Sequence, residues 1–185
     1  IRGAGKKSTV FIKYGTGTTP IFDWSADADI LETYSDFRDF SISGNSKTHH
    51  GISLLRCARF SMKNVDIRSC DRGINNIGAL VWTGRDSDLE HNGTPGNEST
   101  GAFIVGGTSA EFGAGSVSID GCWFEGNKGW TLIFAGGQTS SFSVKDTLIV
   151  NSESGHARLV QSASHVSSSG VDAVSPSDTL WIQAA

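Results

Sequence analysis

The feature that most constrains the fold is a short pattern that recurs five times along the chain. In each copy, two mostly apolar positions two residues apart precede a charged residue, which is followed by Asp, Asn or Gly. An apolar position comes five residues after the pair, and a polar or small residue comes three residues later. The copies begin at Ser35, Phe60, Trp82, Val117 and Phe142, at intervals of 25, 22, 35 and 25 residues. Periods of about 20 to 50 residues are typical of repeat architectures, and these short apolar runs predict coils of β-strand.

Each repeat is predicted to hold three strands separated by two corners. Residues that tolerate positive φ mark the first corner, at Asp39, Asn64, Asp86, Gly121 and Asp146. The second corner is expected at Asn45, Cys70, Asn92, Asn127 and Ser152, where stacked asparagines would form a hydrogen-bonded ladder. A third strand would follow a recurring glycine, at Gly51, Gly73, Gly101, Gly129 and Gly155. Trp82 occupies an inward position of this register and is therefore expected in the core.

The length of 185 residues corresponds to one domain. Neighbouring coils stacked about 4.8 Å apart would bury their apolar side chains together. We therefore predict an all-β fold, a single solenoid domain of stacked β-coils over residues 1–185 with about 22–25 residues per coil. The longest interval contains an insertion, residues 93–100, which is expected to form a loop outside the stack. Because the chain begins at Ile1 rather than Met, we expect a fragment of a longer chain.

Composition excludes several classes of function. The formal net charge of −4 argues against a nucleic-acid partner. No run of 18 apolar residues is present, so membrane insertion is not expected. The three cysteines lack a CxxC spacing and are expected as buried free thiols. The five histidines lack zinc-ligand spacing, and residues 86–90 lack the glycine and distal glutamate of a calcium loop. No metal and no other cofactor is therefore expected.

Several segments resemble a known family. The opening Ile1-Arg2-Gly3-Ala4-Gly5, the run Asn64-Val65-Asp66-Ile67 and the pair Gly73-Ile74 are similar to coils of the pectin-lyase-like superfamily. This resemblance implies that the solenoid is a right-handed parallel β-helix. Within that superfamily the chain most resembles phage tailspikes and related bacterial surface-polysaccharide depolymerases. The resemblance implies a homotrimer in a virion tail or outside the cell, and a substrate such as O-antigen, capsule or exopolysaccharide. The arginine motif and calcium-binding aspartates of pectate lyases have no convincing copy here, so pectate is disfavoured.

Outward positions of the register bring six chemically active residues together. If Val65 and Ile67 point inward, their neighbours point outward, and successive coils align two columns: Asp66, Asp88 and Trp123, and Arg68, Glu90 and Glu125. Carboxyls on such strands would lie roughly 5–7 Å apart, within the range that glycosidases use. We predict Asp88 and Glu90 as the acid and base, with Asp66 or Glu125 tuning their pKa values. Trp123 would stack on a sugar, and Arg68 would contact the substrate.

Other interpretations remain open. The patch is also consistent with a solvated acidic face on a non-catalytic segment of a tail fibre, because solenoids form long rigid shafts without chemistry. Alternatively, a polysaccharide lyase would depend on a base such as Arg68 or His156 rather than on the carboxyls. Further candidates for a groove at a coil edge are His91, Glu98 and Glu111.

Overall fold

The computed structural model is a parallel β-solenoid. It describes residues 1–15, 17, 19–25, 34–45, 49–55, 57–77, 79–97, 99–105, 115–134, 141–151, 153, 155–159, 166–170, 172–174 and 183–184. No helix occurs among these residues, and so the described part of the chain holds no helical segment suited to crossing a bilayer. Its strands are β1 (Val10–Ile12), β2 (Phe22–Ser25), β3 (Tyr34–Ser43), β4 (His50–Leu55), β5 (Cys57–Arg68), β6 (Arg72–Asn76), β7 (Ala79–Arg85), β8 (Asp88–Glu90), β9 (Gly101–Val105), β10 (Ser116–Asp120), β11 (Trp123–Glu125), β12 (Trp130–Phe134), β13 (Ser141–Lys145), β14 (Leu148–Val150), β15 (Gly155–Leu159), β16 (Val166–Ser169), β17 (Asp172–Val174) and β18 (Gln183–Ala184).

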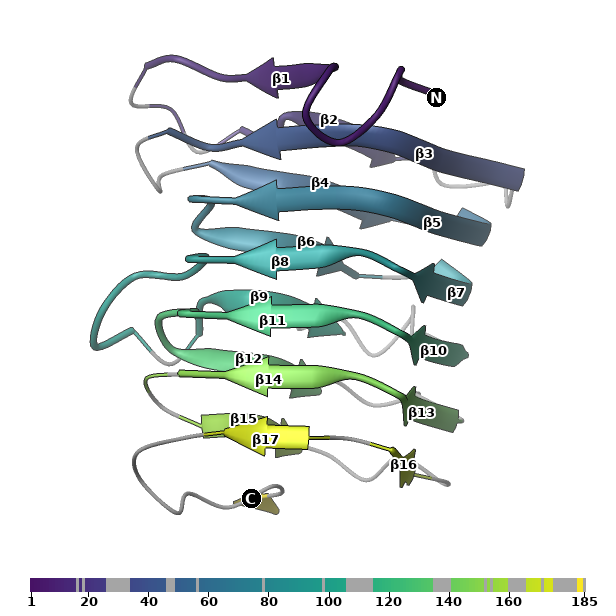
Figure 1. The fold of residues 1–185 in the computed structure, drawn as a ribbon, viewed down its shortest axis with the longest axis vertical. Coiled ribbons are helices and arrows are strands. Elements are labelled where there is room, and N and C mark those ends of the chain that lie inside the picture. Colours follow the sequence, from purple (N-terminus) through teal and green to yellow (C-terminus); the bar gives the residue numbers. More distant parts are fainter. Residues whose placement is uncertain are drawn as a thin grey trace.

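The strands stack into two sheets around one core. In the described residues, an 11-stranded sheet contains β5 together with β7, β8 and their successors, and a 7-stranded sheet runs from β2 to β18. Figure 1 shows the larger sheet in front and the smaller one behind it, with the N-terminus at the top. The front strands run leftward and the back strands run rightward as the chain descends, which is a right-handed path. The predicted right-handed parallel β-helix is confirmed.

The predicted register is also confirmed, residue by residue. One column of strand partners contains Ser35, Phe60, Trp82, Val117 and Phe142, and a second contains Phe37, Met62, Gly84, Ile119 and Val144. A third contains Ile42, Ile67, Leu89, Phe124 and Ile149. The side chains of all three columns are buried. The repeat therefore exists because each coil supplies a layer of apolar side chains that only its neighbours can cover.

The first corner is confirmed by the backbone. The residues predicted there have positive φ, at 61° for Asp39, 55° for Asn64, 49° for Asp86, 61° for Gly121 and 45° for Asp146. Asp and Asn adopt this conformation at lower cost than other residues with a side chain. In β3 and β5 the strand continues through the corner, whereas in later coils it separates into two strands.

The second corner lies one residue earlier than predicted in the later coils. Positive φ values occur at Ser69, His91, Gly126 and Asn151, whereas in the first copy Asn45 itself turns. The chain turns one residue early because the next side chain points back into the core. Ser152 lies outside the described residues.

The predicted asparagine ladder forms at two coils. Asn92 and Asn127 are fully buried, and the backbone N–H of Asn92 donates to Oδ1 of Asn127 over 3.0 Å. Nδ2 of Asn127 donates to the carbonyl oxygen of Leu89 over 2.9 Å. Cys70 takes the preceding position, and its N–H donates to Oδ1 of Asn92 over 3.1 Å. Asn45 is exposed, so the first copy does not extend the ladder.

Loss of this ladder is expected to destabilise the solenoid. Asn127→Ala leaves the N–H of Asn92 and the carbonyl of Leu89 without these partners in a buried site, which costs about 3 kcal/mol. We expect a clearly lowered thermal unfolding midpoint by circular dichroism. Asn45→Gly is the matched control because Asn45 is exposed and glycine tolerates its φ of 55°. Equal midpoints for the two variants would show that the ladder contributes nothing.

The third strands lie at the recurring glycines, as predicted, but these glycines do not all share one register position. Gly51 and Gly73 occupy matching positions because Ile52 pairs with Ile74. Gly101, however, pairs with Arg72 and Trp130, one position earlier. At Gly73 a Cβ atom would lie 2.5 Å from the carbonyl oxygen of Ala102. Close approach of the next coil, rather than a shared register, therefore explains that glycine.

The cysteine and tryptophan expectations hold. Cys57, Cys70 and Cys122 are free and buried, and burial raises the pKa of the Cys70 thiol to about 12. Trp82 is buried and packs on Phe103 with ring centroids 4.5 Å apart.

Residues 93–100 connect β8 to β9 outside the strands, and Figure 1 shows this connection projecting from the stack. Oγ1 of Thr94 donates to Oδ1 of Asp71 over 2.8 Å. This hydrogen bond fixes the start of the connection to the preceding coil.

Candidate functional site

The six residues singled out from the sequence lie together on β5, β8 and β11. Asp66 pairs in the strand register with Asp88, which pairs with Trp123. Arg68 pairs with Glu90, which pairs with Glu125. The residues between them, Ile67, Leu89 and Phe124, are buried in the core, so both columns face outward. We refer to Asp66, Arg68, Asp88, Glu90, Trp123 and Glu125 as the outer patch.

Two of the four carboxylates in the outer patch have cationic partners. Nε of Arg68 lies 3.6 Å from Oδ2 of Asp66. Nζ of Lys6 lies 2.7 Å from Oδ2 of Asp88, and this ion pair joins residues 82 positions apart in the chain. Asp88, one member of the predicted acid/base pair, is therefore engaged by a cation that the sequence pattern did not identify.

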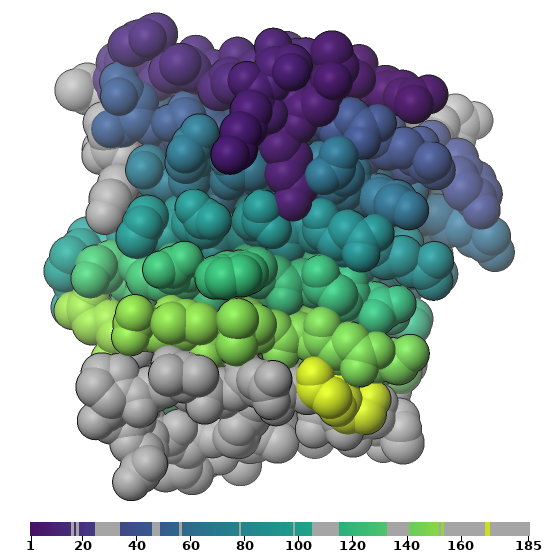
Figure 2. Space-filling model, in the orientation of Figure 1, coloured from purple at the N-terminus to yellow at the C-terminus, as the bar shows by residue number. Residues whose placement is uncertain are grey.

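Lys6 reaches the patch because the N-terminal segment crosses the front sheet. Figure 2 shows the purple N-terminal segment lying over the outer surface of the following coils. The N–H of Ser41 donates to the carbonyl oxygen of Thr9 over 2.8 Å, and Oγ of Ser41 donates to the carbonyl oxygen of Lys6. The residue in the sequence that indicates this crossing is Gly3, because a Cβ atom at that position would lie 2.3 Å from the carbonyl oxygen of Asp39. Only glycine allows this segment to approach the corner so closely.

Asp66 points outward as predicted but is not open to solvent. Only 9% of its surface is exposed, and within the described part of the chain Oδ1 has no hydrogen-bond partner. Burial raises the pKa of its carboxyl and Asp88 adds to this effect, whereas Arg68, Ser41 and Lys6 act in the opposite direction. Ionisation of Asp66 is therefore less favourable in the folded protein than in the unfolded chain.

This pKa shift predicts a pH-dependent effect on stability. Because the folded-state pKa of Asp66 is raised, the folded protein binds more protons than the unfolded chain, and its stability falls as pH rises through that range. Asp66→Asn removes this cost, so the variant should unfold at a higher temperature than the wild type at pH 7. The difference should disappear below the ordinary pKa of 3.8. A variant that is less stable than the wild type at pH 7 would contradict this interpretation.

Glu90 and Glu125 are half-buried and lie beside the exposed Trp123. Burial raises the pKa of the Glu90 carboxyl, and the charges of Asp66, Asp88 and Glu125 raise it further. Nε1 of Trp123 donates to Oε2 of Glu125 over 3.1 Å, while 44% of the Trp123 surface remains exposed. The arrangement places a carboxyl whose pKa is raised beside a second carboxyl and an exposed aromatic ring.

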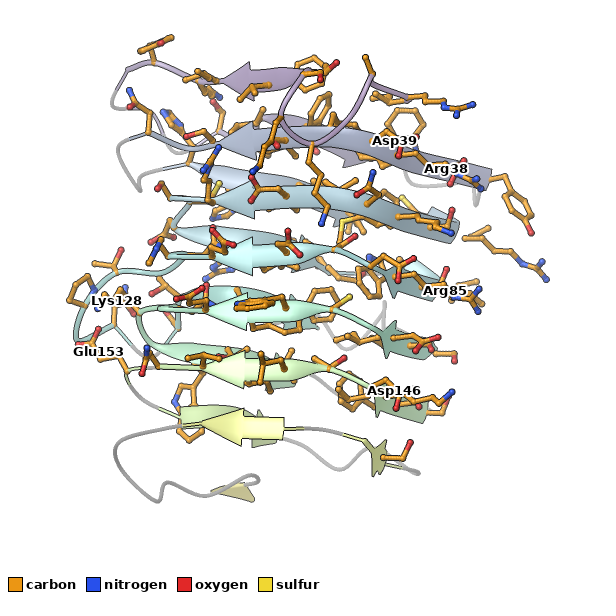
Figure 3. The ribbon with its side chains drawn as sticks, viewed as in Figure 1. Arg38, Asp39, Arg85, Lys128, Asp146 and Glu153 are labelled. Carbon is orange, nitrogen blue, oxygen red and sulfur yellow. The ribbon has the colours of Figure 1, made fainter. Side chains whose placement is uncertain are left out.

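Several of the other charged residues form ion pairs at the first corner. Figure 3 shows Arg38, Asp39, Arg85 and Asp146 along one edge of the front sheet. Ion pairs at this edge include Arg85 with Asp120 and Lys145 with Asp146, with their groups 3.9 Å and 3.3 Å apart. Exposed ion pairs of this kind contribute little to stability, and we assign them no catalytic role.

The other sequence candidates are not part of the patch as described. His91 is exposed at the second corner, directly after Glu90. Glu98 and Glu111 lie outside the described residues, as does the side chain of His156 in β15. Among the residues that the structure describes, no group of three or more His, Cys, Asp and Glu side chains is arranged to hold a metal ion.

Comparison with known proteins relates the chain to a phage protein by fold. No family model matches the chain, and no curated protein matches it. Among solved structures, ORF18 of Geobacillus virus E2 superposes with a TM-score of 0.69 at 15% sequence identity. The match covers 92% of this chain and 37% of that one. It shows a shared fold, and this chain corresponds to little more than a third of the phage protein's length.

Proposed function

We propose that the chain is the β-helix part of a tailspike-like phage tail protein that binds a bacterial surface polysaccharide and hydrolyses its glycosidic bonds. The fold and the similar structure of a phage protein are compatible with a tail protein. The observation that carries the enzymatic proposal is the placement of Glu90 and Glu125 on adjacent strands beside the exposed Trp123. A location in the virion tail or outside the cell and a homotrimeric assembly belong to the same proposal.

The geometry favours Glu90 and Glu125 as the reacting pair over Asp88 and Glu90. Asp88 is held by Lys6, whereas Glu90 and Glu125 pair in register on strands about 4.8 Å apart. Glycosidases that retain configuration hold their two carboxyls about 5–5.5 Å apart. Glu90, whose pKa is raised, would protonate the leaving oxygen. Glu125 would attack the anomeric carbon as the leaving oxygen departs, and water deprotonated by Glu90 would then hydrolyse the resulting glycosyl ester and restore both carboxyls. The negative charges of Asp66 and Asp88 would keep Glu90 protonated before the first step.

A second candidate function is a non-catalytic, receptor-binding shaft. The ion pairs Lys6–Asp88 and Arg68–Asp66 favour it, because they leave only half of the predicted carboxyls without a cation. In this alternative Trp123 contacts a glycan and the carboxyls only shape the surface. The two functions differ in whether the bound polysaccharide becomes shorter.

Incubation with a panel of purified bacterial surface polysaccharides tests the proposal. The proposed function predicts that the full chain binds at least one polysaccharide and lowers its molar mass, as measured by size-exclusion chromatography with light scattering. Binding without loss of molar mass would favour the shaft. Absence of binding throughout a broad panel would contradict both functions.

A further inference from the structure

Resting on the proposed function, we infer that the polysaccharide recognised by the outer patch is uncharged and presents apolar groups, such as deoxy or N-acetyl methyl groups, to the protein. Two features of the patch support this substrate class: its cations are already paired with carboxylates, and apolar side chains continue it on β14.

The charges that face the patch leave a surplus of negative charge. The carboxyls are Asp66, Asp88, Glu90 and Glu125, and the cations are Lys6 and Arg68. Both cations are already engaged, Lys6 with Asp88 over 2.7 Å and Arg68 with Asp66 over 3.6 Å. His91 is the remaining titratable group close to Glu90, and its effect is to lower the pKa of Glu90. Glu90 and Glu125 therefore have no lysine or arginine partner among the described residues.

An acidic sugar would be disfavoured at this surface for two reasons. Because Glu90 is protonated as the proposed acid, a sugar carboxylate here would be repelled by Glu125, and this one contact weakens binding about threefold in water at a separation near 6 Å. In addition, Lys6 and Arg68 could contact that carboxylate only by giving up Asp88 and Asp66. The N-terminal segment partly shields the ion pair of Lys6 with Asp88 from solvent, and the burial of Asp66 partly shields its ion pair with Arg68.

On β14, apolar side chains take the outward positions that charged side chains occupy on β8. Trp123 pairs with Leu148, and Glu125 pairs with Val150, so the two outward columns continue as Leu148 and Val150 on β14. Both side chains are partly exposed. Together with the exposed ring of Trp123 they form an apolar strip directly beside the carboxyls. Such a strip suits the C–H face of a sugar and methyl substituents rather than a charged group.

The inference is tested by comparing two forms of one polysaccharide. A uronate-bearing capsule is bound before and after its carboxyls are reduced to primary alcohols, and affinity is measured by isothermal titration calorimetry with the full chain. The expected result is about threefold tighter binding of the reduced form at low salt. At about 1 M salt, where the Debye length is near 3 Å, the difference should shrink.

Matched variants assign the preference to the patch. The double variant Glu90→Gln and Glu125→Gln should bind both forms with equal affinity, whereas Glu153→Gln, whose carboxylate lies outside the patch and pairs with Lys128, should keep the wild-type preference. Thermal unfolding midpoints verify that the variants fold. Equal or tighter binding of the uronate form by the wild type would overturn the inference while leaving the proposed function intact. If neither form of any capsule in the panel binds, the proposed function fails, and the inference fails with it.

Discussion

Gly84→Ala is expected to destabilise the solenoid by about 3 kcal/mol, the upper end of the usual cost of overpacking a core. Gly84 occupies an inward column whose other members are Phe37, Met62, Ile119 and Val144. A Cβ atom at Gly84 would lie 2.2 Å from Cη2 of Trp82. The indole of Trp82 fills the volume that a side chain at position 84 would otherwise occupy. We expect the thermal unfolding midpoint to fall by roughly 6–12 °C for a chain of this size.

A second substitution distinguishes this packing argument from a general effect of removing glycine. Trp82→Phe removes the three indole atoms nearest the added Cβ, so the double variant should be more stable than Gly84→Ala alone. Gly17→Ala is the control, since its nearest neighbours lie 3.9 Å from an added Cβ. Strictly additive losses in the double variant would show that Trp82 and Gly84 do not share this space.

Glu90→Gln and Glu125→Gln are each expected to lower the rate of polysaccharide cleavage about 100-fold or more, the usual contribution of a positioned acid or base. The amides retain the size of the side chains but cannot transfer the proton or attack the sugar. The measurement is the initial rate of reducing-end release from the polysaccharide that the wild type cleaves. Glu153→Gln, the same change outside the patch, should leave the rate unchanged. Wild-type rates for both patch variants would exclude the carboxyls as the reacting pair.

The pH dependence of the rate provides a separate check on Glu90. As the acid, Glu90 must be protonated, so the rate should decline as pH rises through its raised pKa. Asp66→Asn removes a neighbouring negative charge that contributes to the raised pKa of Glu90. The pH range over which the cleavage rate declines should therefore move to lower pH in that variant. An unchanged pH range would show that Glu90 is not the group that titrates.

The sequence was sufficient to predict the register because the register is set by the core. Columns such as Ile42, Ile67 and Leu89 recur at fixed offsets, and a slip by one residue would expose every one of them. Once the inward positions are fixed, the outward positions follow. This is why the sequence pattern alone aligns Asp66, Asp88 and Trp123 in one outward column.

The electrostatic state of the patch could not be predicted in the same way. Lys6 belongs to a segment outside the repeat, so its ion pair with Asp88 depends on how that segment crosses the sheet. The same crossing accounts for the burial of Asp66, which periodicity assigns to an exposed position. The second corner was misplaced by one residue because both Asn92 and the preceding His91 are compatible with a turn, and only packing decides which of the two turns.

The most direct test of the central claim is to follow the products formed from a bound polysaccharide by the full chain. Reducing ends and the ultraviolet absorbance of unsaturated sugars are measured in parallel. If Glu90 and Glu125 hydrolyse the polysaccharide, reducing ends will appear without that absorbance. Reducing ends accompanied by the absorbance would identify β-elimination and contradict the assignment of Glu90 and Glu125. A bound polysaccharide that releases no reducing ends would contradict an enzymatic role.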